Sequence, residues 1–137
     1  MDLDVDRRAL AAVSAGGVLG ALARYAIGAA WPHTSSEFPW STWLINVSGC
    51  FLIGVLFTLL AHFRPGHRLT RLFLGTGLLG GYTTFSTAEV EVQHATPAIG
   101  LGYLAATITG ALLAVWAGST LAALGTRPRH EAPVDAR

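Results

Sequence analysis

The stretch GTGLLGGYTTFSTAEVE, residues 75–91, combines a G-x-G-x-x-G pattern with two adjacent glycines and a run of serine and threonine residues. That pattern marks a dinucleotide-binding loop only where a strand precedes it, a helix follows and an acidic residue comes about 20 positions later. No β-α-β pattern surrounds this stretch. Arg71 followed by LFLGTGLL predicts a membrane helix instead. We therefore reject the nucleotide interpretation and take the stretch as a polar segment inside a membrane span.

The composition of the 137-residue chain favours lipid as its surroundings. Apolar residues make up 52% and charged residues only 12%, whereas soluble domains carry about 25% charged residues. The net charge of +1 gives no reason to propose nucleic acid, and the single cysteine, Cys50, excludes an internal disulfide and a C-x-x-C site. We expect one all-α integral membrane domain.

Four apolar segments, residues 9–31, 40–63, 72–88 and 98–125, each reach the length that a membrane span needs, the third at the short limit. Their short connections predict antiparallel neighbours. We expect residues 1–125 to form a single four-span channel domain and residues 126–137 a flexible, charged cytoplasmic tail. The N-terminal segment resembles a signal peptide, but its mixed charges and the three later spans favour an uncleaved first helix.

Arginine is the only basic residue type besides histidine, and its distribution is one-sided. The residues that flank the spans are Arg7, Arg8, Arg64, Arg68, Arg71, Arg127, Arg129 and Arg137. With four spans, all of them fall on the same side of the membrane and none on the other. By the positive-inside rule, both termini are expected in the cytoplasm.

The glycines of the third span allow two interpretations. Gly80 and Gly81 lie about 12 Å into the span at 1.5 Å per residue, near the middle of the bilayer, and glycine weakens a helix by about 1 kcal/mol relative to alanine. The helix either opens there to line an ion site, which the membrane tolerates only inside protein, or the glycines permit close helix packing.

The other spans contain hydrogen-bond donors without carboxylates. Asn46 either bridges helices or donates to an anion; Tyr103 and Thr107 form a hydroxyl track on the fourth span; and Arg24 either lines a vestibule or anchors its helix at the interface. Within the spans, acids occur only at the edge of the third, as Glu89 and Glu91, and the five histidines lie in or beside connections and the tail, where we assign them no role. An enzyme needs a nucleophile beside a base, so this donor set favours an anion site.

At these residues the chain resembles the CrcB/Fluc fluoride ion channels. The matching segments are GGVLGALARY, STWLINVSGCFLIG, GGYTTFST and the Tyr-x-x-x-Thr of the last span, and together they cover about residues 14 to 120. The resemblance implies four transmembrane helices with a broken third helix, assembled as an antiparallel dual-pore dimer in the inner cell membrane. It also implies passive export of fluoride from the cytoplasm, and not enzymatic activity.

The resemblance assigns roles to individual residues. Asn46 and Phe85 match pore-facing residues, and Tyr103 and Thr107 match the polar track. Gly80 and Thr83 match the positions whose backbone carbonyls hold a structural sodium ion. Thr42, Ser86 and Thr87 supply further hydroxyls that we expect to contact the anion.

Two positions depart from the family pattern. Ala88 stands where a second phenylalanine is expected, and Ala111 where the polar track has a third hydroxyl. Together with the one-sided arginines, they predict a fixed-orientation subunit that pairs with an oppositely oriented paralogue and has one degraded pore. The alternatives are a small multidrug exporter, which needs a first-span glutamate that is missing here, and a non-conducting scaffold subunit.

Overall fold

The computed structural model describes residues 6–34, 36–63 and 66–126, and within these ranges every regular element is a helix. The long helices are α1 (Arg7–Ala30), α2 (Trp40–Phe63) and α6 (Pro97–Thr126). All three are long and apolar enough to cross a membrane. Three of the four predicted spans are thus confirmed to within two residues at each end.

The third predicted span is a chain of short helices, and its predicted bounds of 72–88 are wrong. It consists of α3 (Arg68–Arg71), the π-helix η1 (Leu72–Leu79), α4 (Gly80–Tyr82) and α5 (Phe85–His94). Thr83 and Thr84 between α4 and α5 are extended, with ψ of 156° and 117°. The helix resumes because the Thr84 hydroxyl accepts a hydrogen bond from the Thr87 amide at 3.1 Å, which is an N-cap.

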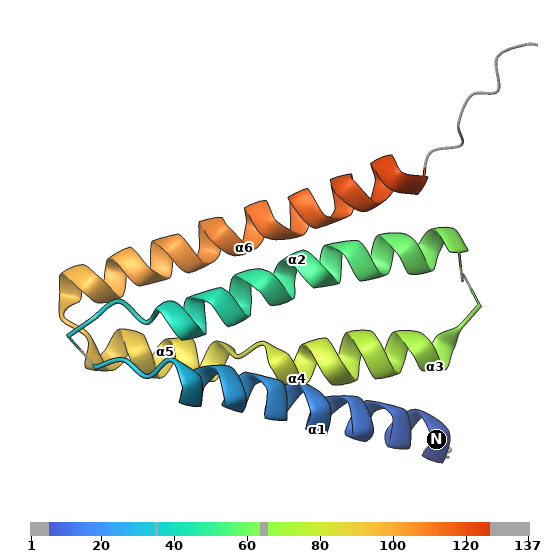
Figure 1. Ribbon diagram of the computed structural model, residues 1–137, viewed down its shortest axis with the longest axis horizontal. Helices are drawn as coiled ribbons and strands as arrows, with labels where there is room; N and C mark the ends of the chain where they lie inside the picture. The colour runs from blue at the N-terminus through green and yellow to red at the C-terminus, as the bar shows by residue number, and fades with distance from the viewer. Residues whose placement is uncertain (1–5, 35, 64–65, 127–137) are drawn as a thin grey trace, which may run out of the picture.

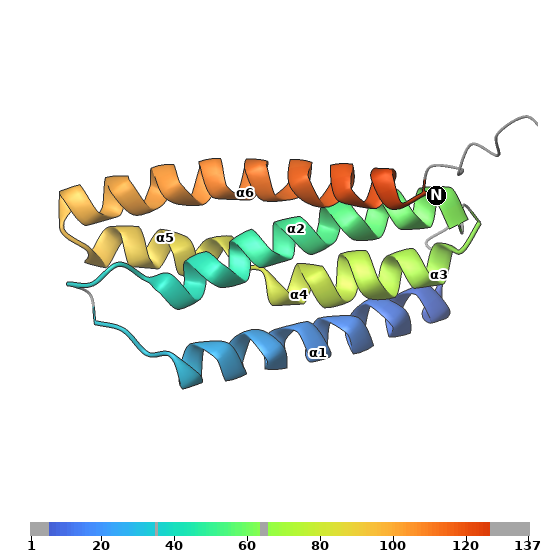
Figure 2. The ribbon, with the colours of Figure 1, turned by 45° about the horizontal axis from the view of Figure 1, so that its top comes forward.

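The helices lie lengthwise in an elongated bundle (Figures 1 and 2). α1 packs along η1 and α4, and α2 packs along α6. The α1–α2 and α5–α6 connections lie together at one end, opposite the N-terminus and the end of α6 (Figure 2). The interruption after α4 falls midway between the two ends, as Figure 1 shows.

Glycines bring these helix pairs into backbone contact. A Cβ atom on Gly16 would lie 2.2 Å from the Phe73 carbonyl oxygen, and one on Gly118 would lie 2.2 Å from the Phe51 carbonyl oxygen. Gly81 packs in the same way against α1, because a Cβ atom on Gly81 would lie 2.5 Å from the Gly17 carbonyl oxygen. Around Gly80, by contrast, the nearest atom to such a Cβ is 3.8 Å away. Close packing therefore applies to Gly81, and the third segment also opens, at Thr83 and Thr84; an ion site there stays a prediction.

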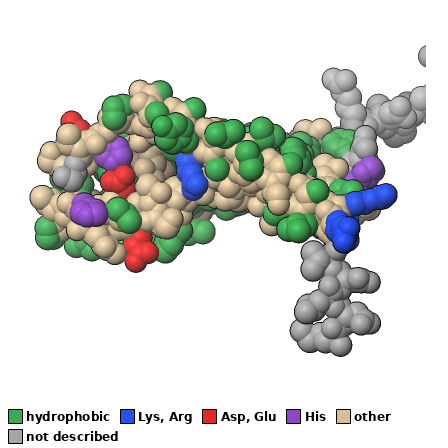
Figure 3. Space-filling model, turned by 90° about the horizontal axis from the view of Figure 1, so that it is seen from below, with side chains coloured by type: hydrophobic (Ala, Val, Ile, Leu, Met, Phe, Trp, Pro, Cys, Tyr) green, Lys and Arg blue, Asp and Glu red, His purple; other side chains and the backbone are tan. Residues whose placement is uncertain are grey.

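The arginines of the described residues follow the predicted asymmetry. Arg7 and Arg8 begin α1, and Arg68 and Arg71 begin the third segment at the same end of the bundle. There the Arg68 Nη1 atom lies 2.7 Å from the Asp6 Oδ2 atom. Figure 3 shows basic side chains at this end and midway along the molecule, acidic side chains toward the other end, and histidine side chains at both ends. The predicted tail, apart from Thr126 at the end of α6, and Arg64, Arg127, Arg129 and Arg137 lie outside the described residues.

Candidate functional site

The interruption of the third segment is held by the side chain of Asn46 on α2. The Thr84 amide donates to the Asn46 Oδ1 atom at 2.8 Å, and the Asn46 Nδ2 atom donates to the Thr84 carbonyl at 2.9 Å. Both residues are buried, with 8% and 6% exposure. Backbone groups freed from a helix must find partners in a membrane, and a primary amide offers both a donor and an acceptor. Asn46 thus bridges helices through its amide oxygen and one N–H group.

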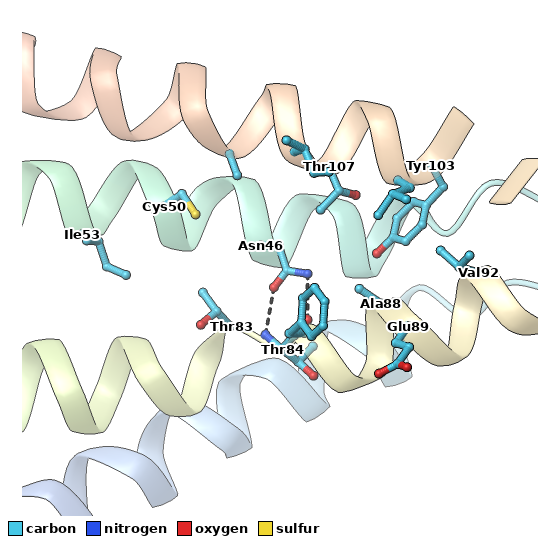
Figure 4. Close-up of a pocket in the computed structure, with 14 residues that line it drawn as sticks. Asn46, Cys50, Ile53, Thr83, Thr84, Ala88, Glu89, Val92, Tyr103 and Thr107 are labelled. Atoms are coloured by element: carbon cyan, nitrogen blue, oxygen red, sulfur yellow. Dashed lines mark hydrogen bonds between the residues drawn. The ribbon is translucent and has the colours of Figure 1, made fainter. Parts of the chain in front are cut away.

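A cavity of about 600 Å³ lies beside this pair, between α2, α5 and α6 (Figure 4). Tyr103 and Thr107 reach it from α6, and their hydroxyls are buried without a hydrogen-bond partner among the described residues. Buried polar groups are ordinarily paired. Two unpaired hydroxyls beside an amide N–H therefore form a site that can donate hydrogen bonds to a small ligand.

Much of the remaining wall of the cavity is apolar. Phe85 lies on it with 79% of its surface exposed, and Ala88 and Ala111 line it as well. An aromatic ring carries partial positive charge at its edge, so Phe85 can face an anion edge-on. Glu89 also lines the cavity, but Figure 4 shows its carboxylate directed away from Asn46 and Tyr103.

The other predicted contact residues divide between two places. Thr42 and Thr87 line a second cavity of about 410 Å³, together with Gly28, Ser41, His33, Glu91 and His94. Thr42 lies one helical turn before Asn46 on α2, and a hydrogen bond of 2.9 Å joins the hydroxyl of Thr84, which lines the first cavity, to that of Thr87, which lines the second. Ser86 is exposed and lines neither cavity; its Oγ atom lies 3.4 Å from the Thr84 Oγ1 atom.

Arg24 reaches the interruption from α1. Its Nη1 atom donates to the Thr83 carbonyl oxygen at 3.2 Å. The Gly80 carbonyl has lost its ordinary helical donor, because the amide four residues later, that of Thr84, bonds to Asn46. Two backbone carbonyls at the break, those of Gly80 and Thr83, are therefore outside regular helical pairing.

Sequence reasoning missed two features of this region. In the sequence Thr84 is only one member of a polar run, but in the structure it caps α5 and forms hydrogen bonds with Asn46. The His33 Nε2 atom lies 3.0 Å from the Glu91 Oε1 atom in the second cavity, whereas sequence gave no role to any histidine. Among the described residues, no group of three histidine, cysteine or acidic side chains is arranged to hold a metal ion.

Comparison with known proteins identifies similar chains over most of the sequence. The family model described as CrcB-like protein, Camphor Resistance (CrcB), matches residues 11–119. The Nocardia farcinica protein named fluoride-specific ion channel FluC 2 is 45% identical over 89% of this chain and 90% of its own. The Streptomyces coelicolor protein named fluoride-specific ion channel FluC 1 is 48% identical over 78% of this chain and 72% of its own. The Rhizobium meliloti protein named fluoride-specific ion channel FluC is 41% identical over 80% of this chain and 91% of its own.

Proposed function

The chain belongs to the CrcB family, as its sequence predicts, and from this premise we propose that it is a fluoride-specific ion channel subunit that releases fluoride from the cytoplasm. It is a multi-pass membrane protein and not an enzyme. The names of its relatives favour a fluoride channel over the multidrug exporter.

One observation of the structure carries this proposal: the first cavity gathers two buried hydroxyls, which interact with each other and with Asn46 but complete no regular hydrogen bond among the described residues. They belong to Tyr103 and Thr107, and the Asn46 amide lies beside them. Fluoride is small and strongly hydrated, so a selective path must replace its water with close donors. Hydrogen bonds to an ionised partner are about twice as strong as neutral ones, so these donors fit an anion.

The exposed face of the interruption supports assembly with a second subunit. Phe85 is 79% exposed beside the open cavity, and Gly80 is exposed as well. A second, antiparallel subunit would cover both and complete the walls of two pores. Exposed apolar side chains that face lipid are ordinary, but polar backbone at mid-membrane has to lie inside protein.

A structural sodium ion fits the ligands that the break provides. The carbonyls of Gly80 and Thr83 from two subunits would hold it, since hard cations prefer oxygen ligands. The Gly80 carbonyl lacks its helical donor, and the Thr83 carbonyl retains a second lone pair beside its bond to Arg24. The ion, when bound, would neutralise these dipoles and join the subunits; it is not transported.

We place the subunit in the inner cell membrane with both termini in the cytoplasm, on the strength of the arginine distribution. Such a bias opposes equal insertion in both directions, so the partner that we propose is an oppositely oriented paralogue. The changes at Ala88 and Ala111 fall on anion-contacting positions, which is what we expect where one pore has degraded. A subunit with both pores closed would be the scaffold alternative.

The test is fluoride efflux from liposomes, followed with a fluoride electrode while a potassium ionophore removes the membrane potential. The purified chain paired with an oppositely oriented relative should release fluoride and retain chloride, whereas the chain alone should release little. Equal efflux from the chain alone would contradict the heterodimer and leave the channel standing. Efflux from neither preparation would overturn the channel.

A further inference from the structure

The second cavity contains a histidine that contacts a glutamate, at the end of the bundle opposite Arg7, Arg8, Arg68 and Arg71. The His33 Nε2 atom lies 3.0 Å from the Glu91 Oε1 atom, and the two side chains are only 18% and 20% exposed. The Ser41 hydroxyl lies 3.4 Å from the other ring nitrogen of His33. Figure 3 shows acidic and histidine side chains gathered at this end.

The pair lies next to hydroxyls that an anion would use. Thr42 and Thr87 line the same cavity, and the Thr84 Oγ1 atom donates to the Thr87 Oγ1 atom at 2.9 Å, beside the Asn46–Thr84 pair. An anion that moves between the two cavities therefore passes the Glu91 carboxylate. A fixed negative charge at such a place repels anions, and the low dielectric of a protein interior strengthens the repulsion.

The charge of the pair depends on one proton. A neutral His33 leaves the pair with the negative charge of Glu91, whereas a protonated His33 cancels it. An imidazole changes charge between about pH 5 and 8. We propose that the His33–Glu91 pair is a proton-dependent charge control on the anion path, so that fluoride passes faster when His33 is protonated; this rests on the proposed fluoride conduction.

Other titratable groups surround the pair and define the controls. His94 lines the same cavity from α5 but bonds the Val90 carbonyl through its Nδ1 atom at 3.0 Å. Glu37 interacts electrostatically with His33 from the α1–α2 connection, and the Tyr103 hydroxyl interacts with Glu91 from α6. On α1, Arg24 donates a hydrogen bond to the Thr83 carbonyl. Of these groups, only Glu91 lies within ion-pair distance of His33.

The experiment measures fluoride efflux from liposomes that hold the conducting preparation, at equal pH inside and outside, from pH 7.5 to pH 5.5. Protein-free liposomes give the leak carried by hydrogen fluoride, which is subtracted. The unaltered protein should conduct at least about threefold faster at the lower pH. His33→Gln keeps a hydrogen-bond donor but no charge, so its efflux should stay low at both values. Glu91→Gln should conduct fast at both.

His62→Gln is the matched control, because His62 lies in the last turn of α2 at the opposite end of the bundle, and its pH response should equal that of the unaltered protein. His94→Gln should retain most of the response. Fast efflux without a pH response, or a response that survives in His33→Gln, would overturn the inference while the channel function stands. No efflux at any pH would overturn both.

Discussion

Asn46 and Thr84 exchange two hydrogen bonds, so the side chain of one helix replaces the backbone partners that the third segment lost when it opened. The same amide lines the cavity in which the unpaired hydroxyls lie. Asn46 therefore serves the fold and the site at once, which makes its substitution informative about both.

Replacing Asn46 with leucine should lower stability as well as efflux. The Thr84 amide and carbonyl would lose their hydrogen bonds to the Asn46 side chain, and each unsatisfied buried group costs about 1–3 kcal/mol. We expect a melting temperature in detergent lower by roughly 5–10 °C, measured by tryptophan fluorescence, and no fluoride efflux. Thr109→Val is the control, since the Thr109 hydroxyl bonds only within α6. Unchanged melting of Asn46→Leu would contradict the bridging role.

Adjacent glycines on α1 should respond differently to alanine. In Gly16→Ala the new Cβ would meet the Phe73 backbone oxygen at 2.2 Å, whereas in Gly17→Ala it would meet nothing within 4 Å. Overpacking costs about 1–3 kcal/mol, and backbone on the other side leaves no side chain to move away. Gly16→Ala should reduce the yield of monodisperse protein several-fold in size-exclusion chromatography, and Gly17→Ala should not. Equal yields would contradict the close α1–η1 approach.

The sequence predicts the long helices well, but it does not predict the bounds of the third segment or the contacts of its glycines. Hydropathy predicted α1, α2 and α6 to within two residues, because a membrane span needs a long apolar run. The same criterion places the end of the third span at Ala88, because the polar residues that follow resemble a connection. In the structure Thr84 caps a new helix, α5, which ends at His94. Nor could spacing tell that Gly81 packs while Gly80 stays open. That difference depends on which face α1 covers.

The sequence also could not predict which residue forms hydrogen bonds with Asn46. The pattern left open whether Asn46 bridges helices or donates to an anion, and the structure supplies the first role directly. The resemblance grouped Asn46, Phe85, Tyr103 and Thr107 as pore residues, and all four line one cavity; their role in a pore stays a prediction. It could not foresee that Thr42 and Thr87 line a second cavity, because that depends on how α2 and α5 are placed around the break.

Phe85→Ala should stop efflux without weakening the isolated subunit. The ring is 79% exposed in the single chain, so truncation removes few contacts within it, whereas pore walls and subunit contact both depend on the ring in our proposal. We expect an unchanged melting temperature for the dissociated subunit and at least a tenfold fall in efflux. Leu112→Ala, at a side chain 64% exposed on α6, should leave both values unchanged. Undiminished efflux from Phe85→Ala would remove this residue from the path.

Arg24→Gln should increase the apparent affinity for sodium. The guanidinium donates to the Thr83 carbonyl, which is one of the proposed sodium ligands, so its charge opposes a cation there. Glutamine keeps a donor and removes the charge. We expect the sodium concentration needed for half-maximal assembly to fall at least about threefold, measured by size-exclusion chromatography across a sodium series. Arg71→Gln, at the arginine-rich end of the bundle, is the control. If Arg24→Gln left the sodium concentration for half-maximal assembly unchanged, the charge of Arg24 would have no influence on the proposed sodium site.

Ala111→Ser should increase fluoride efflux, because it adds a hydroxyl to the wall that already holds Tyr103 and Thr107. These three positions follow one another at intervals of four residues along α6, so their side chains lie on one face of the helix. A third donor would shorten the distance over which fluoride has no hydrogen-bond partner. We expect a rise of at least about threefold, equivalent to roughly 0.7 kcal/mol, which is within the worth of one hydrogen bond.

Ala105→Ser adds the same hydroxyl to α6 at an exposed position that does not line the cavity, and it should leave efflux unchanged. The two variants are compared in the paired preparation by the initial rate of fluoride release. If Ala111→Ser matched Ala105→Ser, the α6 wall of this cavity would not limit conduction, and the loss of a hydroxyl at position 111 could not account for a degraded pore.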